Sequence, residues 1–153
     1  MIMGCYKIGD FKKYFNENMN DLGLPVPEKL FDTMNAAIAN AGLMVETLGT
    51  LGANATIGEL IGAATGLEKI KVVASLGASY YVGAIIGSIA VATGRSLSCG
   101  SRISDLFVFL QQNDLQFDNW NHFYARHPEI LDKNHPFRKN YYNVALGRSR
   151  LYA

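Results

Sequence analysis

The chain alternates between stretches with a helical period of apolar residues and stretches that are almost free of charge. In the N-terminal stretch, Phe11, Phe15 and Met19 recur at helical spacing, which is typical of an amphipathic helix. Gly23 and the prolines that follow it end the pattern. The sequence therefore predicts one short amphipathic helix within residues 1 to 24.

A second amphipathic helix is predicted to begin near Pro27, because proline suits the first position of a helix. Lys29 and Glu46 lie on its polar face. The predicted helix has about five turns and packs against the rest of the protein. Its apolar face consists of Leu30, Phe31, Met34, Ile38, Ala41, Val45 and Leu48.

Two further helices are predicted after residue 95, and no stretch alternates as a strand would. Ser101 or Ser104 is expected to cap the first helix, and Asp118 the second. Asn113 with Asp114 is expected to end the first helix, and Pro128 the second. Their apolar residues are Ile103, Leu106, Phe107 and Leu110 in the first, and Trp120, Phe123 and Tyr124 in the second.

The central part of the chain has the composition of a hydrophobic helical hairpin. Residues 47 to 67 contain one charged side chain, Glu59, and residues 72 to 94 contain none. As a helix, residues 72 to 94 would be about 34 Å long, enough to cross a hydrocarbon core of about 30 Å. We therefore expect an all-α fold in one domain: amphipathic helices in residues 1–46, the hairpin in residues 47–94, and aromatic-rich helices in residues 95–153.

Each half of this hairpin carries small residues at every fourth position, in the sequences GELIGAATG and SYYVGAIIG. Residues four apart lie on one face of a helix, and small residues let helices approach closely inside lipid. In water, glycine within a helix costs about 0.5 to 1 kcal/mol relative to alanine. The predicted membrane-insertion residues are Gly58, Gly62 and Gly66 in the first half and Ser79, Gly83 and Gly87 in the second.

The energy of insertion is marginal for each half. The strongly apolar residues of the second half contribute about −2.4 to −4.8 kcal/mol, and those of the first about −1.8 to −3.6. The acid in the first half costs about 3 kcal/mol, and Tyr80 and Tyr81 lie far from where an interfacial belt would place them. We therefore expect conditional insertion, and that Gly62→Val or Gly83→Val abolishes leakage while the water-soluble fold survives.

Glu59 is the candidate pore-lining residue, because an ionisable side chain within a membrane segment is by default a functional hypothesis. Ionised within an oligomeric ring it would favour cations, and protonation would make insertion easier at acidic pH. The alternative is an ordinary solvent-facing residue on a water-soluble helix.

Composition and motifs argue against several other functions. The formal net charge of +1 lacks the basic signature of a nucleic-acid binder. Cys5 and Cys99 are expected to be free thiols. No common hydrolase or nucleotide-binding motif is present, so we expect no enzyme, no catalytic residue, no cofactor and no metal. The spacing of His122, His127, His135, Glu129 and Asp132 fits no common zinc pattern.

Residues 47 to 94 resemble glycine-zipper pore-forming antibacterial toxins of the kind delivered by type VI secretion and, more distantly, the hydrophobic hairpin of colicins. The resemblance implies oligomerisation in the cytoplasmic membrane of a target cell, ion leakage, and a cognate immunity protein or secretion chaperone as partner. The N-terminus has no continuous apolar run of a secretory signal. We therefore expect a cytoplasmic protein in the producer that a dedicated system exports.

Two alternatives remain open at the level of sequence. One is a soluble helical interaction module, such as an immunity or adaptor protein, whose glycines pack a helical core. The other is a small integral membrane protein such as a holin.

Overall fold

The protein is all-α in a computed structural model that describes residues 11–24, 31–52, 54–56, 59–60, 78–94, 102–117 and 119–132. Apart from an isolated bridge at Thr56, these residues contain no strand, which confirms the predicted fold class. The helices are α1 (Phe11–Asp21), α2 (Met34–Leu51), α4 (Ala78–Ala92), α5 (Ile103–Gln112) and α6 (Trp120–Arg126), followed by the 3-10 turn η2 (Pro128–Ile130).

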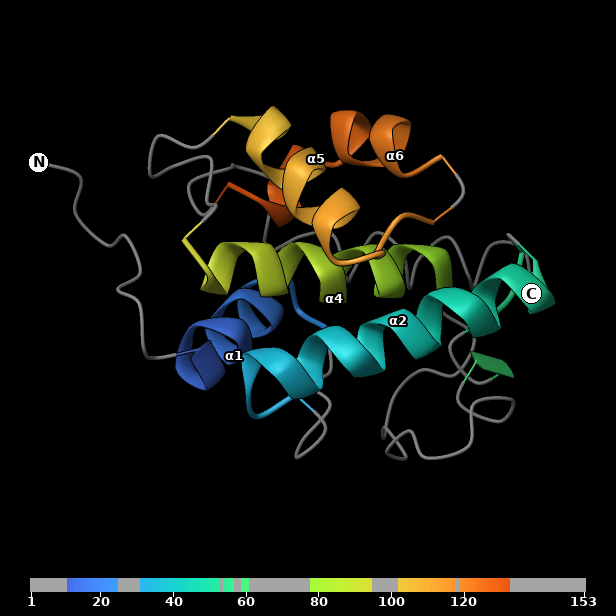
Figure 1. The fold of residues 1–153 in the computed structure, drawn as a ribbon, viewed down its shortest axis with the longest axis horizontal. Helices are drawn as coiled ribbons and strands as arrows, with labels where there is room; N and C mark the ends of the chain where they lie inside the picture. The colour runs from blue at the N-terminus through green and yellow to red at the C-terminus, as the bar shows by residue number, and fades with distance from the viewer. Residues whose placement is uncertain are drawn as a thin grey trace, which may run out of the picture.

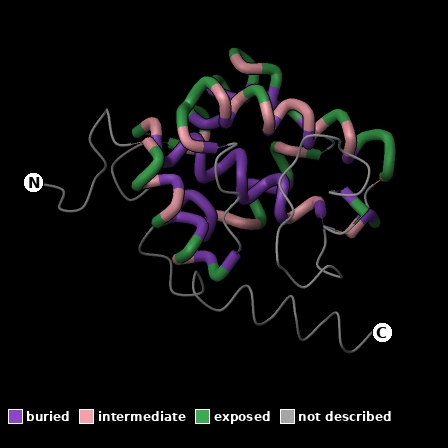
Figure 2. The backbone as a smooth tube through the Cα atoms, turned by 90° about the horizontal axis from the view of Figure 1, so that it is seen from below, coloured by how far each residue is buried: buried purple, intermediate pink, exposed green. Residues whose placement is uncertain are grey.

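Helix α4 is the centre of the bundle. It lies between α1 and α2 on one side and α5 and α6 on the other (Figure 1), and it contacts all of them and η2. Every residue from Tyr81 to Ala92 is buried, as is Ala78, while Ser79 and Tyr80 are half-buried. Figure 2 shows this buried helix running through the middle of the molecule. A helix that is apolar on all sides has to be enclosed in this way in water.

Helix α1 confirms the first predicted helix. It buries Phe15 and Met19 against α4 together with one polar residue, Asn18. The helix ends in a Schellman motif, in which the Leu24 amide donates to the Met19 carbonyl at 3.0 Å and Gly23 adopts a φ of 72°. Glycine adopts this left-handed conformation without steric cost, which explains why the helix ends there.

Helix α2 begins at Met34, so the start predicted near Pro27 is wrong. Thr33 is extended, with φ of −125°, and its side chain accepts a hydrogen bond from the Ala36 amide at 3.2 Å. A threonine cap satisfies one of the unpaired amides of the first turn, which proline does not. The buried face also differs from the predicted one: Met34 is 42% exposed, and Ile38 and Val45 are half-buried. The buried residues are Ala37, Ala41, Met44 and Leu48.

The first half of the predicted hairpin is not one helix. Residues 47–51 belong to α2, and Gly52 ends that helix with a φ of 97°. A new turn starts at Thr56, just after Ala55, whose carbonyl accepts a hydrogen bond from the Ala78 amide at 2.9 Å. The first half therefore already contacts the start of α4 in the folded protein.

The C-terminal helices follow the prediction except at their caps. Helix α5 begins after Arg102, whose amide donates to the Asp105 carboxylate at 2.7 Å, rather than after Ser101 or Ser104. Helix α6 begins after Asn119, in the left-handed conformation, rather than at Asp118. The Asp105 carboxylate, three residues into the helix, thus satisfies the Arg102 amide as the acid of a capping box does, and this contact marks the start of α5.

The apolar stripe predicted for α5 is largely confirmed. Leu106 and Leu110 are buried, while Ile103 and Phe107 are half-buried, and Phe109, which the prediction omitted, is buried as well. Asn113 ends α5, and α6 ends at Arg126, shortly before Pro128, both as predicted. Pro128 itself starts the 3-10 turn η2.

Candidate functional site

The candidate site is the face of α4 that carries Ser79, Gly83 and Gly87, which we call the glycine face. It is covered by residues 120–131, comprising α6 and η2, which we call the cap. A Cβ atom added to Gly83 would overlap the Phe123 ring, and one added to Gly87 would overlap the Ile130 side chain. The glycines therefore let the cap approach the α4 backbone more closely than any larger residue would permit.

This packing corrects one expectation from the sequence. Because the Phe123 ring occupies the space next to Gly83, the substitution Gly83→Val would disturb the folded form described here as well as any membrane form. Gly58, Gly62 and Gly66 lie outside the described residues, and so do Cys5 and Cys99. The role of the three glycines in insertion and the free state of the two thiols therefore stay predictions.

Tyr124 ties the cap to the α4 backbone. Its hydroxyl donates to the Gly83 carbonyl at 2.7 Å, and its side chain is completely buried. Burial raises the pKa of the Tyr124 phenol well above its ordinary value of 10.0, an effect that the backbone amide of Gly87 partly offsets. The buried phenol therefore favours the neutral, hydrogen-bonding form.

This contact predicts a dependence of stability on alkaline pH. Tyr124 keeps its proton in the folded protein, whereas the unfolded chain loses it above about pH 10. The contribution of Tyr124 to the free energy of unfolding is therefore fully present below that pH and falls above it. We expect Tyr124→Phe to cost about 1 to 3 kcal/mol at pH 8. The difference in unfolding free energy between the two proteins should shrink by about 1.4 kcal/mol at one pH unit above 10. Urea denaturation at pH 8 and pH 11 measures both values, and a constant difference would contradict the assignment.

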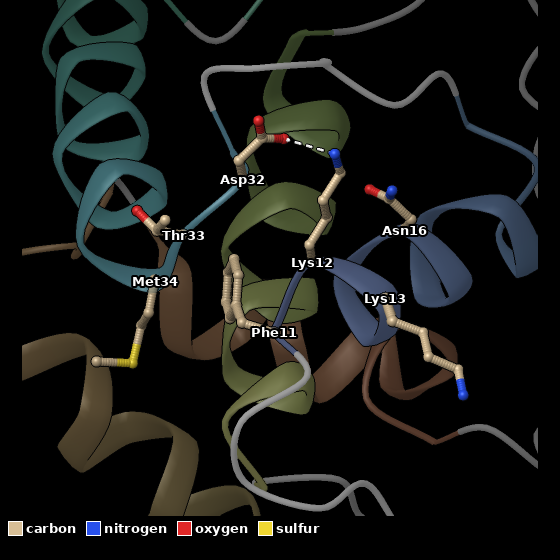
Figure 3. Close-up of a pocket in the computed structure, with 7 residues that line it drawn as sticks. All are labelled: Phe11, Lys12, Lys13, Asn16, Asp32, Thr33 and Met34. Carbon is tan, nitrogen blue, oxygen red and sulfur yellow. Dashed lines mark ion pairs between the residues drawn. The ribbon is translucent and has the colours of Figure 1, made fainter.

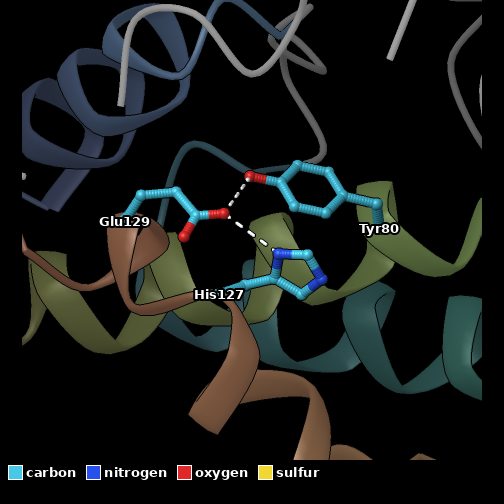
Figure 4. Close-up of polar contacts among 3 residues, drawn as sticks. All are labelled: Tyr80, His127 and Glu129. Carbon is cyan, nitrogen blue, oxygen red and sulfur yellow. Dashed lines mark hydrogen bonds and ion pairs between the residues drawn. The ribbon is translucent and has the colours of Figure 1, made fainter. Parts of the chain in front are cut away.

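A second polar contact joins the cap to α4 at a buried carboxylate (Figure 4). Glu129 Oε1 lies 3.0 Å from His127 Nδ1 and 3.4 Å from the Tyr80 hydroxyl. The Glu129 side chain is 7% exposed and that of His127 is 25% exposed. The Tyr80 and His127 rings also meet edge to face, with centroids 5.2 Å apart. A buried charge needs such donors, because removing it from water is costly.

Asn18 joins three elements at one buried point. Its Nδ2 atom donates to the Ser88 hydroxyl of α4 at 2.9 Å and to the Ile130 carbonyl of the cap at 3.0 Å. Its Oδ1 atom is buried without a hydrogen-bond partner. Sequence reasoning missed this residue, although a polar side chain between Phe15 and Met19 on the apolar face of α1 was the available signal.

An aromatic cluster fills the space between α5, the cap and α4. Phe123 packs against the rings of Phe117, Tyr124, Tyr80 and His127, with centroid distances from 4.7 to 5.8 Å. Trp120, at the start of α6, meets Phe107 edge to face at 4.6 Å. Such edge-to-face pairs contribute beyond their buried area, so the cap is held by packing as well as by hydrogen bonds.

Glu59 lies away from the cap contacts just described. It is exposed, and its Oε1 atom accepts hydrogen bonds from the Thr56 amide at 3.2 Å and the Thr56 hydroxyl at 3.1 Å. The Thr56 hydroxyl in turn accepts from the Glu59 amide at 3.2 Å. This reciprocal pair is a capping box. In the folded form the Glu59 side chain thus caps the start of a helical turn. Its pore-lining role stays a prediction.

A separate open hollow of about 560 Å³ lies between the start of α1 and the start of α2 (Figure 3). It contains an exposed ion pair, Lys12 Nζ to Asp32 at 3.4 Å. Exposed pairs of this kind contribute little to stability. The lining residues are Phe11, Lys12, Lys13, Asn16, Asp32, Thr33 and Met34.

Among the residues described, neither a metal-binding cluster nor a membrane-spanning helix is present. His127 and Glu129 do meet, but no group of three or more histidine, cysteine or acidic residues in the described ranges is arranged to hold a metal. None of the helices described is both long enough and apolar enough to cross a membrane; α4 has 15 residues.

Comparisons with known proteins give no relative. No family model matches the chain, and neither the curated proteins nor the solved structures contain a match.

Proposed function

We propose that this protein permeabilises membranes, and that it does so when α4 leaves the helices that enclose it. The observation that carries the proposal is the burial of α4: an uncharged helix with Tyr81 to Ala92 all buried forms the core of the bundle. The face on which Phe123 and Ile130 pack carries Gly83 and Gly87. Sequences of this kind suit helix contacts in lipid at least as well as a core in water.

The energies support a conditional process rather than permanent insertion. The valine and isoleucine residues of α4 contribute together only about −1.5 to −3 kcal/mol to insertion. This gain is comparable with the loss of a few cap contacts. Association of glycine faces from several copies supplies the remaining stabilisation in the membrane, where close backbone packing is the main source of affinity. The valine and isoleucine residues are Val82, Ile85, Ile86, Ile89 and Val91.

The resemblance of residues 47–94 to glycine-zipper toxins supports a more specific form of this proposal. The membrane is then the cytoplasmic membrane of a competing bacterial cell, the lesion is an oligomeric ion pore, and the producer holds a cognate immunity protein. Delivery by a dedicated secretion system follows from the same resemblance.

The proposal is tested with purified protein and lipid vesicles. We expect the protein to collapse a potassium gradient across anionic vesicles. Expression with a periplasmic signal is expected to lower the membrane potential and arrest growth of the host, whereas expression in the cytoplasm, as the matched control, should be less harmful. Vesicles that keep their gradient at every pH and protein concentration would overturn the proposal.

A soluble interaction module is the second candidate, and one observation favours it. Gly83 and Gly87 are already used in the core, where Phe123 and Ile130 fill the space beside them. In that case the glycine face has no role beyond folding. The vesicle assay separates the two candidates, because only the first predicts leakage.

A further inference from the structure

We propose that the outer face of α2 binds the same face of a second copy of this chain, with the two helices antiparallel. This interface goes beyond the proposed function, because it joins two folded copies in the absence of a membrane. Helix α2 lies at the edge of the bundle and packs on α4 with its inner side (Figure 1). The outer face consists of Asn35, Ala39, Gly42, Glu46 and Gly49, of which Gly42 is half-buried and the others are exposed.

The outer face has the spacing of a helix-pairing surface. Its five residues are separated by four, three, four and three positions, which is the period of a coiled-coil seam. Half-buried apolar residues border this seam on both sides. In an antiparallel pair they meet across the interface, Ile38 with Val45 of the second copy and Ala36 with Leu43 of the second copy. The seam thus has an apolar border on each side.

The charge on this face favours the antiparallel direction. Ala39 then lies opposite Gly42 of the second copy, and in the same register Asn35 lies opposite Glu46 of the second copy. A two-fold axis makes each contact twice, as in an isologous interface. The two Glu46 residues are then about 16 Å apart, at 1.5 Å per residue, which exceeds the screening length of about 8 Å. In a parallel pair Glu46 would face Glu46, and like charges opposite each other are unfavourable.

Asn35 and Glu46 make the interface complementary in polarity. Glu46 is the single charged residue of α2, and the Asn35 amide of the second copy can donate to its carboxylate. Hydrogen bonds to an ionised acceptor are the stronger kind. The neighbouring Thr50 hydroxyl already donates to the Glu46 carbonyl of its own helix at 3.2 Å. Covering this face therefore leaves few polar groups without a partner, which keeps the cost of burial low.

Gly42 and Gly49 have no packing role within one copy. Among the described residues, a Cβ atom added to either glycine would meet nothing within 4 Å, whereas Gly83 and Gly87 are covered by the cap. Glycine within a helix costs about 0.5 to 1 kcal/mol relative to alanine. A second helix that packs closely against the α2 backbone gives both glycines a structural role.

The interface is tested first by the oligomeric state of the purified protein without lipid. Each copy contributes one helix of 18 residues, and interfaces that bury less than about 1,200 Å² are weak or transient. We therefore expect a micromolar dissociation constant. Sedimentation equilibrium between about 1 and 200 µM covers that range. A protein that stays monomeric at all of these concentrations would overturn the proposal.

Two substitutions at Asn35 test the direction of pairing. Asn35→Lys places an ammonium opposite Glu46 of the second copy and should tighten the dimer about three- to tenfold at low salt, whereas Asn35→Glu should weaken it by a similar factor. Positions 35 and 46 of one copy are too far apart to pair with each other. Gln111→Lys and Gln111→Glu are the matched controls, because Gln111 is exposed on α5, and they should leave the dissociation constant unchanged.

Gly42→Gln is the blocking variant. Its side chain would separate the two helices where they cross, so the dissociation constant should rise at least about tenfold. The free energy of unfolding of one copy should not fall, because the added Cβ has open space and glutamine favours a helix more than glycine does. A dimer that Gly42→Gln leaves intact contradicts the proposal, and so does a dissociation constant that Asn35→Lys and Asn35→Glu move in the same direction or leave unchanged. None of these measurements involves lipid, so their outcome is independent of the vesicle assay.

Discussion

Replacing Gly83 by valine is expected to lower the free energy of unfolding by about 3 kcal/mol, at the upper end of what overpacking a core usually costs. The new side chain would overlap the Phe123 ring. That ring has little room to move, because Phe117 and Tyr124 pack against it with centroids 5.4 and 5.1 Å away. Urea denaturation followed by Trp120 fluorescence and helical circular dichroism measures the loss.

The matched control for this prediction is a glycine in a helix with open space beside it. Gly42 lies within α2, and a Cβ added there would meet nothing within 4 Å. Gly42→Ala is therefore expected to raise the free energy of unfolding by about 0.5 to 1 kcal/mol, the usual gain in helix propensity. Equal stabilities of Gly83→Val and the wild-type protein would show that the cap does not pack on α4 as described.

The amphipathic helices could be predicted from the sequence because their signal is local. Phe11, Phe15 and Met19 share one face whatever lies opposite, and the buried stripe of α5 follows from the same period. Helix starts were less predictable. Pro27 is a good first residue of a helix, but Thr33 offers a side-chain hydrogen bond to Ala36, and that local contact places the start of α2.

The meaning of the glycine face could not be predicted in the same way. Small residues at a spacing of four show that something approaches the helix closely, and they do not say what. In the folded protein it is the cap, where Tyr124 donates to a carbonyl 41 positions earlier in the chain. No periodic pattern links Gly83 to Phe123, nor Asn18 to Ser88 and Ile130, because such partners are chosen by the packing of the whole bundle.

The same reasoning explains why the sequence drew attention to Glu59 and not to Glu129. Glu59 stands out in a stretch with no other charge, whereas Glu129 lies in a segment rich in polar residues. The two acids differ in burial in the folded protein. Glu59 is exposed in a capping box, whereas the Glu129 side chain is 7% exposed where the cap meets α4. The cost of placing a charge depends on its surroundings in space rather than on its neighbours in sequence.

Tethering α1 to α4 is expected to abolish leakage, because α4 cannot then leave the bundle. Asn18 and Ser88 are suitable positions, since their side chains meet at 2.9 Å in the core. They meet through an amide and a hydroxyl, and a direct disulfide needs Cβ atoms about 3.8 Å apart. The double variant Asn18→Cys, Ser88→Cys is therefore cross-linked during refolding with a bifunctional methanethiosulfonate reagent that has one methylene spacer. This reagent joins the two cysteines with less movement of the backbone than a direct disulfide. Cys5→Ser and Cys99→Ser remove the natural thiols.

The tethered protein should release potassium from anionic vesicles at less than about a tenth of the rate of the same protein after reduction. A native cross-link typically stabilises the closed form by about 2 to 4 kcal/mol, which exceeds the 1.4 kcal/mol of a tenfold change. The two single-cysteine variants treated with the reagent are the controls, because they carry the same chemistry without the tether. If the cross-linked protein, with its link verified by mass, leaks as fast as the reduced one, α4 permeabilises the membrane without leaving α1, and release of the core helix is not the mechanism.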